Sequence, residues 1–218
     1  MVRALLWDND GVLVDSETLF FETTQSVFFS FGLKLDDSLW RDRYLGRGAH
    51  SVDIAQMLGA TAQKAHEVVA HRNMVFWQRL EQPVALRPSI AQTLAKLHSL
   101  FRMGVVTSAP RRQFDLLHAH TGLRDYFECI ITADDCSKIK PDPEPYFTAL
   151  QCMGLPPEEC LAIEDSPRGL ASAAAAGIRC VVIQTALTDL SACDRAFAII
   201  ENAHELDTVL QTISPSAN

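Results

Sequence analysis

The sequence predicts an α/β fold, a Rossmann-like, mostly parallel sheet with helices on both faces plus an inserted α-helical cap domain. From residue 84 onward, short apolar runs alternate with helical segments, as strands buried on both faces of a parallel sheet do. Between residues 16 and 82, four helical segments follow one another without a strand, far more chain than one crossover needs. We therefore predict a discontinuous core of residues 1–15 and 84–218 and a cap domain of residues 16–83.

The strands of the predicted core are short apolar runs bounded by polar or turn residues. The first, Leu5-Leu6-Trp7, leads into a turn marked by Gly11. Further strands are expected at about 103–107, 129–132, 160–163, 179–183 and 196–200. Helices are expected between them at about 90–101, 111–121, 144–153 and 167–176, and again near the C-terminus.

The cap domain is predicted to begin with a helix that Ser16 caps and Gly32 ends. Helical patterning continues over about 36–45, resumes through 54–58, and covers 61–80. The loop Gly46-Arg47-Gly48-Ala49-His50 interrupts it, and paired glycines are typical of loops that move or approach a ligand. Arg47 and His50 are the expected specificity contacts of this loop, and ordinary surface roles are the alternative.

Composition excludes several classes of protein. A chain of 218 residues, 48% of them apolar, can bury a sizeable core. Its net charge of −8, without any run of Lys or Arg, argues against nucleic acid or an anionic membrane as the main partner. No apolar stretch approaches the roughly 18 to 20 residues of a membrane span, and no signal peptide is recognised. We expect a cytoplasmic monomer.

Two carboxylates, Asp8 and Asp10, follow the first strand directly. Like charges at this spacing repel each other and lose hydration, so they call for a cation or a shared proton. A calcium loop of the EF-hand type requires Gly at its sixth position and Glu at its twelfth. Gly11 is fourth and Leu19 is twelfth, so the segment does not fit an EF-hand calcium loop.

Three other strand ends carry polar groups, and strand ends of a parallel sheet meet at one edge. Thr107 and Ser108 offer hydroxyls and backbone N–H groups suited to a phosphate oxygen, or they cap the next helix. Lys140 precedes a proline that restricts its backbone, although a lone lysine in a polar loop is usually exposed. Glu164 and Asp165 form a second acidic pair, which could also stabilise a helix N-terminus.

Together these segments resemble the four motifs of the haloacid dehalogenase (HAD) superfamily. The motifs are DxDGxLxDS from Asp8, the Thr or Ser at 107, the Lys before Pro at 140, and the acidic pair before Ser166. The resemblance covers essentially the whole chain. The strings KPDPEPY and EDSPRG are similar to those of the branch with a helical cap, which includes phosphoglycolate phosphatases and β-phosphoglucomutase-like sugar phosphatases.

The resemblance implies a Mg²⁺-dependent phosphatase with an aspartyl-phosphate intermediate. Asp8 would be the nucleophile and Asp10 the general acid and base, and Thr107, Ser108 and Lys140 would bind phosphoryl oxygens. The ligands of Mg²⁺ would be Asp8, the backbone carbonyl of Asp10, Asp165, and Glu164 directly or through water. The implied substrate is a small phosphomonoester, such as a sugar, polyol or glycolate phosphate.

Asp10 decides against one alternative, a dehalogenase, whereas a mutase and a phospho-acceptor module stay open as less favoured alternatives. Dehalogenases of the superfamily lack an acid at the position of Asp10, which favours phosphate chemistry. β-Phosphoglucomutase-like mutases carry a His and an Arg at the positions that Phe20 and Ala49 occupy, which favours hydrolysis. Receiver-type phospho-acceptor modules lack a cap insertion and keep their acceptor Asp on a middle strand, whereas Asp8 follows the first strand.

Overall fold

The computed structural model describes residues 1–46 and 48–213. The chain divides into two compact units. One, the core unit, comprises Met1–Asp15 and the residues from Ala85 onward, and the other, the helical unit, is Ser16–Val84. Within the described residues, no helix is long and apolar enough to cross a membrane.

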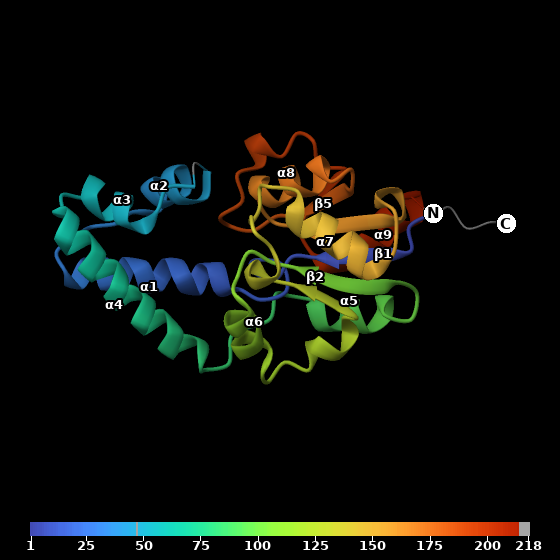
Figure 1. The fold of residues 1–218 in the computed structure, drawn as a ribbon, viewed down its shortest axis with the longest axis horizontal. Coiled ribbons are helices and arrows are strands. Elements are labelled where there is room, and N and C mark those ends of the chain that lie inside the picture. Colours follow the sequence, from blue (N-terminus) through green and yellow to red (C-terminus); the bar gives the residue numbers. More distant parts are fainter. Residues whose placement is uncertain (47, 214–218) are drawn as a thin grey trace. The chain divides into compact units, whose positions relative to one another are not determined.

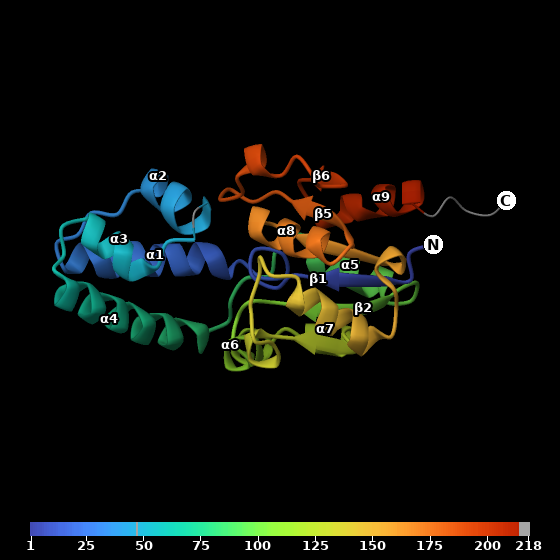
Figure 2. The same ribbon diagram turned by 45° about the horizontal axis from the view of Figure 1, so that its top comes forward.

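The core unit is built on a six-stranded parallel sheet in the order β3-β2-β1-β4-β5-β6 (Figures 1 and 2). The strands are β1 Ala4–Trp7, β2 Arg102–Val106, β3 Cys129–Ile131, β4 Cys160–Glu164, β5 Arg179–Ile183 and β6 Ala198–Ile200. Strand β1 lies between β2 and β4, and Trp7 pairs with Val105 on one side and Ile163 on the other. The strand order reverses at β1, which places a ligand-binding crevice at its carboxyl end.

Helices cover both faces of this sheet. The helices α5 Ile90–Leu97, α6 Arg111–His118 and α9 Leu206–Ile213 contribute to one apolar cluster, and α7 Glu144–Met153 and α8 Pro167–Ala175 to a second. Alternate residues of β1 serve the two clusters, with Leu5 and Trp7 in the first and Leu6 in the second. Burial on both faces explains why the strands read as continuous apolar runs, and the predicted fold class is confirmed.

The helical unit contains α1 Ser16–Ser30, α2 Asp37–Leu39, a π-helix at Trp40–Gly46, α3 Ser51–Met57 and α4 Ala62–Leu80. It has its own apolar cluster, which includes Phe28, Trp40, Ile54 and Val68. The helical segment predicted over about 36–45 is present, as a short α-helix that gives way to a π-helix at Trp40. Residues four apart lie close together in both helix types, as the stacked rings of Trp40 and Tyr44 with centroids 4.0 Å apart show. The sequence spacing therefore did not distinguish an α-helix from a π-helix.

Short 3₁₀ helices complete the core unit. They lie at Leu123–Tyr126, Ala133–Asp135, Pro157–Glu159, Leu190–Ala192 and Ala203–Glu205.

Candidate active site

Asp8 stands at the carboxyl end of β1, where the chain turns sharply. Its backbone N–H donates to the carbonyl of Ile163 at 2.8 Å, which continues the pairing with β4. The carbonyl of Asn9 then accepts from the N–H of Leu13 at 2.8 Å, and Gly11 has a φ of +79°. A residue with a side chain rarely adopts that φ, so the glycine allows the turn that leaves Asp8 and Asp10 at the strand end.

Lys140 reaches Asp8 from the loop between β3 and α7. It is 4% exposed, and its Nζ lies 3.0 Å from Oδ1 of Asp8 and 2.5 Å from Oε1 of Glu164. Nζ also donates to the carbonyl of Val106 at 2.8 Å. The ammonium is therefore buried between two carboxylates and is not the exposed surface lysine that its polar loop could have suggested.

Burial and charge act against each other at this ion pair. Burial raises the pKa of Asp8 well above its usual range, Glu164 raises it further, and Lys140 opposes the rise. Burial alone would lower the pKa of Lys140, but Asp8 and Glu164 together raise it above its ordinary value. Lys140 is thus held as a cation, and Asp8 depends on positive charge nearby to be ionised.

Three buried carboxylates, those of Asp8, Glu164 and Asp165, could hold a metal ion. Each offers an oxygen within 4.8 Å of the others. Oε1 of Glu164 accepts from the Tyr146 hydroxyl at 2.6 Å, whereas its Oε2 is buried without a hydrogen-bond partner among the described residues. When all are ionised, these three carboxylates exceed the single positive charge of Lys140 by two negative charges. A divalent cation fits this donor set.

Gly11 also leaves space for this cluster. A Cβ added at Gly11 would lie 2.0 Å from Oδ2 of Asp165, far inside van der Waals contact. A Cβ at Gly169 would similarly lie 1.8 Å from Oε2 of Glu164. The two glycines therefore let the carboxylates of Asp165 and Glu164 occupy their positions beside the backbone.

Asp10 is held by the residue that follows β2 and by a residue of α6. The Thr107 hydroxyl donates to its Oδ2 at 3.2 Å, and Gln113 Nε2 donates to its Oδ1 at 3.2 Å. The N–H of Ala109 donates in turn to the Thr107 hydroxyl oxygen at 3.0 Å. Ser108 is half-buried in the same turn. The structure thus brings Thr107 to Asp10, and places the carboxyl of Asp10 outside the cluster of three.

The two residues predicted to set specificity lie in the helical unit. His50 is exposed at the start of α3, and its backbone N–H donates to Asp53 at 3.1 Å. Arg47 lies outside the described residues. Phe20, at the position where related mutases carry a histidine, packs its ring 4.9 Å from Phe76.

Sequence reasoning missed several residues that support the site. Arg168, whose place in the sequence indicates only a surface or helix-end charge, donates to the backbone carbonyl of Lys140 at 2.7 Å and fixes that loop. His118 was not assigned to any cluster, yet it is buried and contacts Asn9. Tyr146 stood inside the motif string after Lys140, which was a usable signal. Gln113 carried none, because only the packing of α6 brings it to Asp10.

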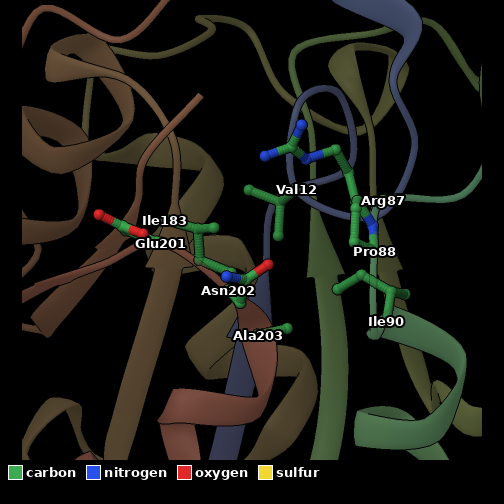
Figure 3. A pocket seen from close by; sticks show the side chains of 8 residues that line it. All are labelled: Val12, Arg87, Pro88, Ile90, Ile183, Glu201, Asn202 and Ala203. Carbon is green, nitrogen blue, oxygen red and sulfur yellow. The ribbon is translucent and has the colours of Figure 1, made fainter. Parts of the chain in front are cut away.

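The core unit also contains a pocket that is lined by other residues. Val12, Ile90 and Ile183 lie around it together with Arg87 and Glu201 (Figure 3). Its lining includes none of the predicted site residues that the structure describes. This pocket is therefore distinct from the candidate site at the carboxyl end of β1.

Comparison with known proteins agrees with this geometry. Residues 5–183 match the family described as haloacid dehalogenase-like hydrolase. The chain is 34% identical to validoxylamine A 7'-phosphate phosphatase of Streptomyces hygroscopicus subsp. limoneus, covering 85% of this chain and 87% of that protein. It is 33% identical to protein CbbY of Rhodobacter capsulatus, covering 88% and 91%.

A solved structure gives the same result. CbbY from Rhodobacter sphaeroides, crystallised in complex with phosphate, superposes with a TM-score of 0.73 at 27% identity, covering 94% of this chain and 96% of that one. The fold, the motif positions and these relatives agree. The chain therefore belongs to the haloacid dehalogenase-like hydrolase family, among its phosphatases.

Proposed function

We propose that this protein is a Mg²⁺-dependent phosphatase that hydrolyses a small phosphomonoester through an aspartyl-phosphate on Asp8. One observation carries the proposal. The Asp8 carboxylate lies 3.0 Å from the buried ammonium of Lys140 and belongs to one buried cluster with the carboxylates of Glu164 and Asp165. In that arrangement a cation and an ammonium could both offset the charge of an incoming phosphoryl group, which supports a nucleophilic role for Asp8.

In the first step, an oxygen of Asp8 attacks phosphorus and the bond from phosphorus to the substrate oxygen breaks. Asp10 gives its proton to the leaving alcohol, and Lys140 and Thr107 hold phosphoryl oxygens. In the second step, Asp10 takes a proton from the water that attacks phosphorus, and the bond to Asp8 breaks. Splitting the displacement in this way returns the enzyme to its starting state and releases phosphate.

Asp8, Asp165, Glu164 and the backbone carbonyl of Asp10 would hold the Mg²⁺. The ion would supply charge neutralisation at the phosphoryl oxygens. Hard carboxylate and carbonyl oxygens suit Mg²⁺ better than softer metals. Because Glu164 already binds Lys140 and Tyr146 through Oε1, its free Oε2 is the atom we assign toward the ion or a water that it holds.

The substrate we propose is a sugar, polyol or glycolate phosphate. Among the relatives, one is named for validoxylamine A 7'-phosphate, and the CbbY structure contains phosphate. We assign the helical unit the role of a cap that selects the alcohol part, with Arg47 and His50 as contacts. Hydrolysis is favoured over mutase chemistry because Phe20 packs among aromatic rings of the helical unit and offers no proton-transfer group.

The direct test is release of inorganic phosphate from a panel of phosphomonoesters. We expect steady turnover with Mg²⁺ and loss of at least about 10²-fold in rate after chelation with EDTA, restored by adding Mg²⁺. A hexose 1-phosphate in the panel would be assayed for isomerisation as well. A stable phosphoprotein without turnover would instead indicate a phospho-acceptor module and would refute the proposal.

Replacing Gly11 with alanine should weaken Mg²⁺ binding. The new Cβ would collide with Oδ2 of Asp165, so that carboxylate must move. We expect the Mg²⁺ concentration for half-maximal activity to rise about tenfold, in the range seen when groups that orient metal ligands are lost.

Gly32→Ala is the matched control for Gly11→Ala. Gly32 has nearly the same φ, +80° against +79°, but nothing lies within 4 Å of its added Cβ. It should therefore show the backbone strain without a change in Mg²⁺ requirement. An unchanged Mg²⁺ requirement in a folded Gly11→Ala variant would contradict this part of the account.

A further inference from the structure

Asn9, the residue between Asp8 and Asp10, is fully buried and connects Asp10 to a histidine. Its Nδ2 donates to Oδ2 of Asp10 at 3.2 Å, and its Oδ1 lies 2.7 Å from Nε2 of His118. A carboxylate accepts hydrogen bonds but does not donate them, so the amide nitrogen must face Asp10. The amide oxygen then faces His118, and Nε2 of that ring must carry the proton.

His118 is suited to donate from Nε2 without becoming charged. It ends α6, is 6% exposed, and its Nδ1 lies 3.0 Å from the Thr121 hydroxyl. Burial lowers the pKa of His118 to about 4, with Asp10 and Asp115 raising it and Arg124 lowering it. The ring is therefore neutral at pH 7, with Nδ1 free to accept from Thr121 while Nε2 donates to Asn9.

All the other donors to Asp10 described above come from the same segment of chain. Thr107 directly follows β2, and Gln113 lies on α6 about one turn and a half before His118. Asn9 adds a donor from the turn after β1, far from this segment in sequence. His118 fixes the plane of the Asn9 amide. Each oxygen of Asp10 thus has an assigned donor, and the orientation of one donor depends on His118.

We propose that Asn9 and His118 are positioning residues that hold the carboxyl of Asp10 in the orientation required for proton transfer to the leaving group. The inference rests on the proposed function, since it assigns Asp10 the role of general acid and base. In this role both residues act through Asp10. A misplaced general acid costs rate in proportion to how much the leaving group needs a proton.

That dependence separates positioning from mere packing of a buried amide. A simple alkyl phosphate releases a basic alkoxide and needs the proton of Asp10. p-Nitrophenyl phosphate releases a weakly basic phenolate and needs it little. The quantity to compare is kcat/KM, because it reports the steps up to formation of the phosphoenzyme and is insensitive to its later hydrolysis.

The experiment compares wild type with Asn9→Leu, His118→Leu, His118→Gln and the double variant Asn9→Leu/His118→Leu. A complete general acid contributes roughly 10²–10⁴-fold, so loss of positioning should lower kcat/KM for the alkyl phosphate by about tenfold or more. For p-nitrophenyl phosphate we expect less than about threefold. His118→Gln, which keeps an N–H donor, should recover most of the loss.

The double variant keeps the test valid if a single variant folds poorly. Replacing both partners by apolar groups leaves neither polar group unpaired between them, and its effect should be smaller than the product of the two single effects. His120→Leu, an exposed histidine two residues away, is the matched control and should resemble wild type. Equal losses on both substrates, or a folded double variant as active as wild type on the alkyl phosphate, would overturn the inference.

Asp10→Asn, measured in parallel, separates this inference from the proposed function. If Asp10→Asn shows the selective loss on the alkyl phosphate and the His118 variants do not, the positioning role is refuted and the phosphatase stands. If Asp10→Asn loses nothing, or wild type releases no phosphate, the proposed function itself fails.

Discussion

Replacing Asp8 with asparagine is expected to abolish phosphate release, with a loss of about 10⁴-fold or more in kcat. The amide has nearly the shape of the carboxylate, so it can remain beside Lys140, but it cannot attack phosphorus. Lys140 keeps its contact with Glu164, and the variant removes one of several mutually repelling carboxylates, so folding should be retained. The loss of activity then reports the nucleophile and not the stability of the protein.

The measurement is phosphate release at saturating substrate, with thermal unfolding of the same preparation. Asp125→Asn is the control, because Asp125 is an exposed aspartate of the core unit that the mechanism does not use. It should retain wild-type turnover. Phosphate release by Asp8→Asn above about a thousandth of the wild-type rate would exclude Asp8 as the nucleophile.

Replacing Lys140 with methionine is expected to affect both catalysis and stability. Methionine has similar length but no charge, so Asp8 and Glu164 lose their ammonium and repel each other in a buried site. Removing one partner of a buried ion pair typically costs about 3 kcal/mol or more in the free energy of unfolding. Activity should fall about 10²–10³-fold, because the charge on the phosphoryl oxygens is no longer offset.

Lys138→Met provides the comparison for Lys140→Met. Its side chain is 70% exposed and pairs with Asp142 at the surface, so its loss should cost less than about 1 kcal/mol and leave turnover intact. Added Mg²⁺ should restore part of the stability of Lys140→Met, because the ion binds the folded site. A Lys140→Met variant with wild-type stability and turnover would show that the buried ion pair is not part of the mechanism.

The main residues of the candidate site could be predicted because Asp8, Thr107 and Asp165 directly follow strands and Lys140 lies in the loop after β3. Asp8, Thr107, Lys140 and Asp165 lie in short segments whose apolar runs and turn residues are local in sequence. In a parallel sheet the carboxyl ends of strands meet, so local patterns were enough to bring these residues to one edge. The chemical role of each residue was inferred from the family resemblance.

The supporting residues could not be predicted in the same way. The contacts of Gln113 and His118 with the Asp10 turn join positions more than a hundred residues apart, and they depend on how α6 rotates against the sheet. In the sequence, Arg168 is an ordinary charged residue in the first turn of α8. Its hydrogen bond to the backbone carbonyl of Lys140 depends on the path of the loop that contains Lys140. These contacts depend on tertiary packing, for which single-residue patterns carry no signal.

The central claim, a phosphoryl group carried by Asp8, is tested most directly by trapping it. The wild-type enzyme is mixed with substrate and Mg²⁺, quenched in acid within the first turnover, digested, and mapped by mass spectrometry with and without borohydride reduction. The account predicts a phosphorylated peptide that contains Asp8, converted to homoserine at that position by reduction and absent from Asp8→Asn. Phosphorylation at another residue, or substrate turnover without any phosphorylated peptide, would contradict it.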